Sequence, residues 1–242
     1  LILTNIQKDV ADQLVYDAWD RANLMAQYSA RIVFTAFDQF EWGDNGGLWQ
    51  LVYRNIRNAK QLYELAEEKE NPSYQAISLI LRAWTIQILT DVYGDVPYSE
   101  AVSAFQEDPI IQPKFDAQRD IYTGILQDLS DANLLLSQEG LPSVRGDIYN
   151  DGDLGKWRKF ANSLRLRAYM RLSNVDPQTA GSGISEIFNN MDNNPFVMTN
   201  EDNITLTYLP NNPNVHPRSE VSGYRVGSFN EYRMTETIEN IL

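Results

Sequence analysis

Hydrophobic positions along the chain recur mainly at helical spacing. Apolar residues between 6 and 32 fall at three- and four-residue intervals, which predicts a first helix there, and Thr4 with Gln7 has the form of a capping box. A second stripe predicts a helix over about 47–69. The spacing therefore predicts long helices from the start of the chain.

Helix start and stop signals divide the rest of the chain. Asn71-Pro72 predicts the start of a helix that ends at Gly94 and Pro97, and Asp176-Pro177 predicts the start of another that reaches about residue 190. Asp116 is expected to cap a helix that extends to about 136, and a basic helix is expected over about 153–173.

The character of the chain changes after residue 190. Asparagine and proline are frequent there, Ile204, Leu206 and Tyr208 alternate like a short strand, and a last helix is expected from about Thr235. We predict an all-α, tetratricopeptide-like scaffold of helical pairs over 1–190, followed by an irregular segment over 191–242 that leads into a helix and is truncated. No legible 34-residue repeat is present.

Composition narrows the classes of function. The formal net charge of −13 argues against nucleic acid and anionic lipid as main partners. The absence of cysteine excludes disulfides, thiolate metal sites and cysteine nucleophiles. His216, the one histidine, lies in a turn-rich segment and is expected to be solvated rather than catalytic. We expect no catalytic residue, no cofactor and no metal site.

Three segments suggest chemistry, each with a structural alternative. Residues 147–153, "DIYNDGD", resemble a calcium loop but lack the required ligands at its third and twelfth positions, so a turn leading to a helix cap at Asp151 or Asp153 is favoured. Six of the 20 basic residues fall within 156–171; they could bind an anion, but neutralising acidic neighbours is favoured.

The loop 40–49, "FEWGDNGGLW", is the strongest candidate for binding sugar. Flat aromatic faces stack on sugar rings, and planar polar groups pair with hydroxyls. We therefore assign Trp42 as a stacking platform, with Asp44 and Asn45 as hydroxyl partners. Trp49, in contrast, is expected to be a core residue at the start of the next helix.

Three motifs in order carry a resemblance to a known family. They are "LTDVYGDVPYSEA" at 89–101, "PKFDAQRDIYTGILQDLSDANLLL" at 113–136 and "GDIYNDGDLGKWRKFANSLRLRAYMRLS" at 146–173. Together they resemble the SusD/RagB family, in its SusD-like branch, and this chain resembles the N-terminal half of that family's proteins.

The resemblance implies a non-catalytic, surface-exposed lipoprotein of the outer membrane. Such a protein binds glycan or another nutrient and delivers it to a TonB-dependent, SusC-like transporter, and its lipid anchor would lie outside this chain. Two alternatives remain open from the residues themselves. They are a helical-repeat adaptor that binds a protein or peptide, and a glycoside hydrolase with two facing carboxylates.

Overall fold

The computed structural model describes residues 1–41, 43, 46–104, 106, 108–212 and 214–241. The chain divides into two compact units, each discontinuous in sequence. The first comprises Leu1–Gln7 and Gln50–Thr205, and the second comprises Lys8–Trp49 and Leu206–Leu242. The sequence boundary expected at residue 190 stays a prediction.

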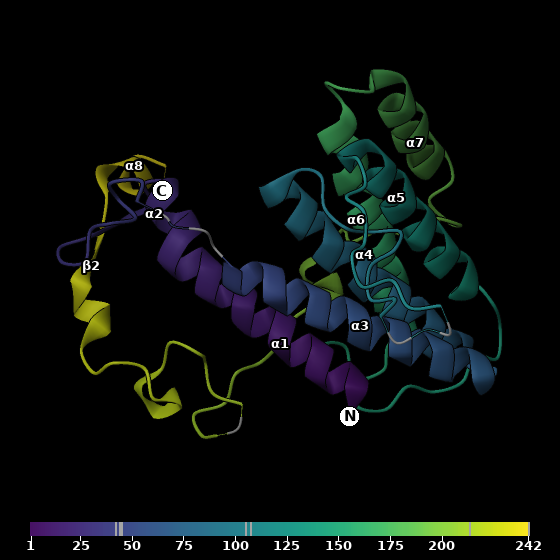
Figure 1. The fold of residues 1–242 in the computed structure, drawn as a ribbon, viewed down its shortest axis with the longest axis horizontal. Helices are drawn as coiled ribbons and strands as arrows, with labels where there is room; N and C mark the ends of the chain where they lie inside the picture. Colours follow the sequence, from purple (N-terminus) through teal and green to yellow (C-terminus); the bar gives the residue numbers. More distant parts are fainter. Residues whose placement is uncertain (42, 44–45, 105, 107, 213, 242) are drawn as a thin grey trace. The chain divides into compact units, whose positions relative to one another are not determined.

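Helices dominate the first unit. They are the start of α1 (Ile2–Asp17), most of α3 (Gly46–Glu68), α4 (Pro72–Tyr93), α5 (Gln118–Leu135), α6 (Leu154–Leu172) and α7 (Pro177–Asn189), with a 3-10 turn η2 at Asn200–Asp202. Consecutive helices from α4 to α7 pack pairwise and lie side by side (Figure 1). This arrangement confirms the predicted all-α fold built from helical pairs.

Helix α4 lies at the centre of the first unit because it is apolar on nearly every side. Ile77, Ile80, Ile86 and Leu89 have no exposed surface. A helix that is hydrophobic all round must be covered by neighbours on all its faces. Trp157 of α6 is equally buried, so the core extends from α4 into the basic helix.

The caps of three helices were predicted correctly. The Asn71 side chain accepts a hydrogen bond from the Tyr74 N–H (3.2 Å), Asp153 caps α6 through Lys156 N (3.1 Å), and Asp176 caps α7 through Thr179 N (3.2 Å). Each satisfies an N–H that has no partner within its own helix. Asp153 also confirms that 147–153 is a turn leading to a cap.

Two predicted caps were wrong, because each side chain has a partner distant in sequence. Helix α1 already begins at Ile2, and the Thr4 hydroxyl donates to the Gly146 carbonyl (2.7 Å) instead of capping a helix. Asp116 accepts hydrogen bonds from Tyr98 N (3.0 Å) and Ser99 N (2.7 Å). Asp95 takes over the capping of α5, since its Oδ1 accepts from Gln118 N at 2.9 Å.

The segment 89–101 joins the end of α4 to the start of α5. Gly94 ends α4 with φ +75° and ψ −123°, a conformation that favours glycine, and an isolated antiparallel bridge pairs Val96 with Asp116. The Tyr98 ring packs against Gly124 of α5, where an added Cβ would lie 2.3 Å from the Tyr98 hydroxyl oxygen. These contacts confirm that the segment terminates the helix and that Tyr98 is a packing residue.

The second unit begins as a helix and ends as a short ribbon. Its elements are the rest of α1, a π-helix η1 (Ala18–Ala22), α2 (Asn23–Met25), β1 (Ser29–Arg31), the start of α3, 3-10 turns η3 (Glu220–Ser222) and η4 (Ser228–Glu231), β2 (Tyr232–Met234) and α8 (Glu236–Glu239). The predicted continuous helix over 6–32 was therefore wrong beyond Met25. Gln27 has a positive φ of 56°, and Ser29–Arg31 pairs antiparallel with β2, a partner that local periodicity cannot reveal.

A stacked arginine ties the two parts of the second unit together. The Arg218 guanidinium lies between the rings of Tyr16 (3.7 Å) and Tyr224 (4.3 Å) and pairs with Asp20 in the π-helix. Asp20 also accepts a hydrogen bond from the Tyr232 hydroxyl (2.5 Å). The helix predicted near Thr235 is present as α8, but no strand forms at Ile204–Tyr208, where the alternation has no partner strand.

Candidate functional site

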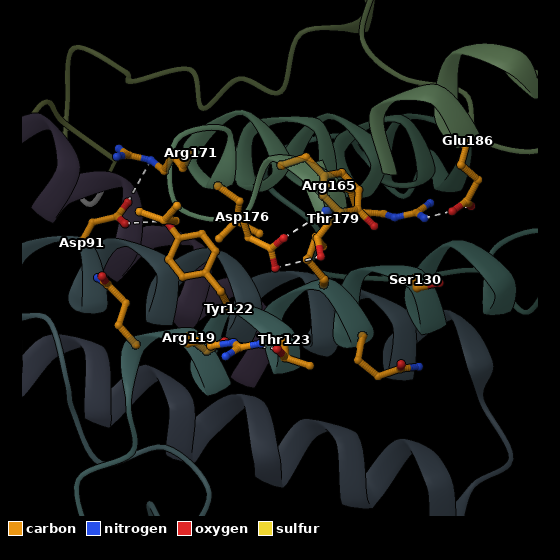
Figure 2. Close-up of a pocket in the computed structure, with 16 residues that line it drawn as sticks. Asp91, Arg119, Tyr122, Thr123, Ser130, Arg165, Arg171, Asp176, Thr179 and Glu186 are labelled. Atoms are coloured by element: carbon orange, nitrogen blue, oxygen red, sulfur yellow. Dashed lines mark hydrogen bonds and ion pairs between the residues drawn. The ribbon is translucent and has the colours of Figure 1, made fainter. Parts of the chain in front are cut away.

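A cleft of about 1120 Å³ opens in the first unit between α5 and the pair α6–α7 (Figure 2). One wall is formed by α5. Its lining residues recur at three- and four-residue intervals, so they lie on a single face of the helix. The other wall comes from α6, α7 and the turn that joins them, and the end of α4 closes one side. The lining residues are Asp91, Gln118, Arg119, Tyr122, Thr123, Leu126, Gln127, Ser130, Arg165, Tyr169, Arg171, Leu172, Val175, Asp176, Thr179 and Glu186.

Close approach of α6 and α7 shapes one wall of the cleft. The Tyr169 ring of α6 packs against Gly183 of α7, where an added Cβ would lie 2.1 Å from the ring. Such a distance is far below van der Waals contact, so only glycine allows these two helices to pack this closely.

Asp91 organises the end of the cleft nearest α4. Its carboxylate accepts a hydrogen bond from the Tyr122 hydroxyl (2.6 Å) and pairs with Arg171 Nε (3.1 Å). Burial, and then the hydrogen bond to Asp91, raises the pKa of Tyr122 above its ordinary value. The phenol therefore stays protonated at neutral pH and remains a donor to Asp91.

Arg165 lies deeper in the cleft, 3% exposed. Its Nη1 donates to the Asn162 side-chain oxygen (2.9 Å) and the Asn194 side-chain oxygen (2.8 Å), and its Nη2 reaches Glu186 Oε1 at 3.2 Å. Figure 2 shows Arg165 directed along the cleft toward Glu186. Buried arginine is unusual, and the polar groups that compensate for this burial are two amide oxygens and one carboxylate.

The basic helix pairs with acids and with amides. Lys159 pairs with Asp202, Arg165 with Glu186 and Arg171 with Asp91. The predicted neutralisation by acidic neighbours is confirmed for these three. The other two arginines of this helix bind amide oxygens instead of acids. Arg158 donates to the Asn133 side-chain oxygen, and Arg167 donates to the Gln87 side-chain oxygen.

The predicted sugar-binding residues Trp42, Asp44 and Asn45 lie outside the described residues, so their assignment stays a prediction. Trp49, expected in the core, is partly buried at the start of α3. His216 Nδ1 accepts a hydrogen bond from Arg218 N (3.1 Å), and its ring lies edge-on to Tyr208.

The described ranges contain no group of three or more His, Asp and Glu residues able to hold a metal ion. None of their helices combines the length and apolarity needed to cross a membrane. The carboxylate of Asp147, the first position of the calcium-like motif, is occupied by donors of the protein itself, including Trp157 Nε1 at 2.8 Å.

Comparison with known proteins identifies the family of this chain. A family profile named SusD-like_2 and described as "Starch-binding associating with outer membrane" matches residues 1–242. The chain belongs to the SusD-like family. Comparison with curated proteins finds no match.

Solved structures similar to this SusD-like chain agree with that assignment. A SusD homolog from Bacteroides fragilis is 30% identical with a TM-score of 0.72, and the match covers 95% of this chain and 48% of that one. A Bacteroides vulgatus protein, proposed to be an outer-membrane protein involved in nutrient binding, is 28% identical (TM-score 0.75; 98% and 49% covered). A chitin-binding SusD homolog from Flavobacterium johnsoniae is 25% identical (TM-score 0.72; 96% and 48% covered).

The SusD-like chain therefore spans about half the length of these solved relatives. The resemblance read from the three sequence motifs is confirmed, and coverage of about half of each relative is consistent with a chain that corresponds to the N-terminal half. Those motifs build the scaffold, since Asp95, Asp116 and Asp147 bind backbone and side-chain donors of the protein itself.

Proposed function

We propose that this chain binds glycan at the cell surface and delivers it to a TonB-dependent, SusC-like transporter in the outer membrane, without catalysing a reaction. The observation that carries the proposal is the family match over residues 1–242, supported by a chitin-binding relative of the same fold. The proposal includes exposure at the cell surface and attachment to the membrane through a lipid anchor.

Within this proposal, the loop around Trp42 contributes to glycan binding. A tryptophan face stacks on the apolar face of a sugar ring, and the neighbouring Asp44 and Asn45 offer planar groups for its hydroxyls. Because a relative binds chitin, oligomers of N-acetylglucosamine are the first ligands to test.

Calorimetric titration of the full chain with these oligomers, alongside a panel of other neutral oligosaccharides, tests the proposal. Trp42→Ala is expected to weaken binding by at least about tenfold, the order of one lost stacking contact. Asp95→Asn is expected to leave affinity unchanged, since Asp95 caps α5. Phe115→Ala, which removes an exposed ring from a different loop, is the matched aromatic control.

Two results would contradict the proposal. Failure of the full chain to bind any glycan would favour a protein-binding adaptor instead. Equal losses for Trp42→Ala and Phe115→Ala would remove the special role of the 40–49 loop. Crosslinking in intact outer membranes tests the transporter partner separately, because a SusC-like barrel should be the main crosslinked product.

A further inference from the structure

Of the three guanidinium nitrogens of Arg165, Nε is the one that has no hydrogen-bond partner. Nη1 and Nη2 donate to the groups described above, but Nε is buried and has no hydrogen-bond partner. A buried donor without an acceptor costs free energy that a folded protein seldom leaves uncompensated. Nε of Arg21, Arg31 and Arg218 is also buried without a partner, so the Arg165 atom points to a ligand only together with the cleft that it lines.

Nε and Nη2 form one edge of the guanidinium, and that edge is filled at two other arginines of the same unit. At Arg82, Nε donates to Asp128 Oδ2 (2.8 Å) while Nη2 binds Oδ1 (2.5 Å). At Arg167, both atoms reach the Gln87 carbonyl oxygen. The same edge of Arg165 is only half occupied, which is the geometry that a second carboxylate oxygen would complete.

Glu186, which holds the occupied half of that edge, is a replaceable partner. The Glu186 side chain is 57% exposed, and its single contact with Arg165 joins Oε1 to Nη2 at 3.2 Å. Exposed carboxylates contribute little to an ion pair because water competes with the partner. A ligand carboxylate that binds both Nε and Nη2 would gain a two-point contact in place of a one-point contact.

The charges of the cleft also favour an acidic ligand. Arg119, Arg165 and Arg171 line it together with three acids, so the lining is neutral while Glu186 points inward. When Glu186 swings out, three cations face two carboxylates, leaving a charge of about +1 on a protein whose net charge is −13. A ligand carboxylate restores the balance.

Sugar hydroxyls suit the rest of the cleft. Thr123, Gln127 and Ser130 place hydroxyl and amide groups along the α5 wall. Tyr122 and Tyr169 are only 4% and 9% exposed, so contacts would be made by polar edges rather than by stacking. We propose that this cleft binds a uronic acid residue of an acidic glycan, with its carboxylate on Nε and Nη2 of Arg165 in place of Glu186. The choice of a sugar rests on the proposed function.

Titration of the full chain with a galacturonic acid trisaccharide tests this site, with the carboxyl-reduced trisaccharide as the neutral probe. Glu186→Gln is expected to tighten binding of the acid by about two- to fivefold, the equivalent of losing a weak competing ion pair. Asp192→Asn, which removes the same charge from an exposed residue outside the cleft, is expected to change nothing. The neutral probe should bind at least about tenfold more weakly than the acid.

Arg165→Lys keeps the charge but removes the fork, and is expected to weaken binding of the acid by at least about tenfold. Arg158→Lys, which makes the same exchange on the same helix outside the cleft, is its control. Since Arg165 is buried, circular dichroism must first show that the Arg165→Lys protein is folded. If the Arg165→Lys protein does not fold, the affinity of the Glu186→Gln protein for the acid alone tests the site.

Equal affinities for the acid and the neutral trisaccharide would overturn the inference, as would equal effects of Glu186→Gln and Asp192→Asn. This failure is distinguishable from failure of the proposed function. Loss of neutral glycan binding alone would leave the acid site standing, whereas binding of N-acetylglucosamine oligomers without binding of the acid would remove this site only.

Discussion

Asp147→Asn should be one of the most destabilising conservative substitutions in the chain. Asp147 is 8% exposed, and its carboxylate accepts hydrogen bonds from five donors. Its Oδ1 receives Gln7 Nε2 (2.6 Å), Tyr149 N (3.0 Å) and Asn150 N (3.2 Å), and its Oδ2 receives Gly152 N (3.0 Å) and Trp157 Nε1 (2.8 Å). The carboxylate thus joins α1, the 147–152 turn and α6.

The cost of the substitution follows from counting donors. An asparagine can keep its oxygen toward the first three donors, but its NH₂ group then faces the N–H groups of Gly152 and Trp157. The buried Trp157 Nε1 and the partly buried Gly152 N lose their acceptor at about 1–3 kcal/mol each, so the free energy of unfolding should fall by about 2–6 kcal/mol. The opposite orientation leaves three donors without an acceptor and costs more.

Asp153→Asn is the matched control. It removes the same charge from the same segment, but asparagine caps a helix about as well as aspartate, so stability should change by less than about 0.5 kcal/mol. Urea unfolding followed by both tryptophan fluorescence and circular dichroism measures the two, and the probes must coincide for a two-state free energy to apply. A cost below about 1 kcal/mol for Asp147→Asn, or one equal to that of Asp153→Asn, would refute the reasoning.

Further predictions concern close packing, backbone strain and acid. Gly183→Ala should lower the free energy of unfolding by about 1–3 kcal/mol because its methyl group meets the Tyr169 ring. Gly181→Ala has open space around its methyl group and should raise the free energy of unfolding by up to about 1 kcal/mol. Urea unfolding of both variants separates packing from helix propensity. Gly94→Val should lower the free energy of unfolding by about 1–3 kcal/mol through its positive φ alone, since no atom lies within 4 Å of a Cβ added at this position. An unchanged unfolding midpoint would contradict this. The hydrogen bond from Lys159 of α6 lowers the pKa of Asp202 from 3.8 to about 2. The contribution of Asp202 to the free energy of unfolding should therefore be complete above about pH 4 and lost as the pH falls toward 2. A carboxyl NMR titration of Asp202 with a midpoint near 4 would exclude this.

Local sequence signals predicted the helices well where a cap and its helix are adjacent. Asn71-Pro72 and Asp176-Pro177 mark their helices because the cap acts on N–H groups only three residues away. Thr4 and Asp116 have the right residue types, but their side chains bind groups far away in the sequence, at Gly146 and at Tyr98–Ser99. Residue type alone cannot separate these cases.

The cleft could not be predicted, for a related reason. Its walls come from helices whose lining residues extend from Asp91 to Glu186, and a pattern within one helix does not reveal the face of another. Sequence did find Arg165 as part of a basic helix. What distinguishes it from Arg167 is the identity of its partners, Glu186 in place of Gln87, which depends on packing.

The bonds around segment 89–101 also separate the scaffold from the loop that follows. Val96 pairs with Asp116, and the Asp116 carboxylate binds Ser99, so the chain between Ser99 and Asp116 leaves and returns at nearly the same point. Closing a longer loop between fixed ends is inexpensive, about 0.6 kcal/mol for each doubling in length. This excursion is therefore a place where insertions of new sequence, including additional binding residues, can be accepted while the helices on either side keep their register.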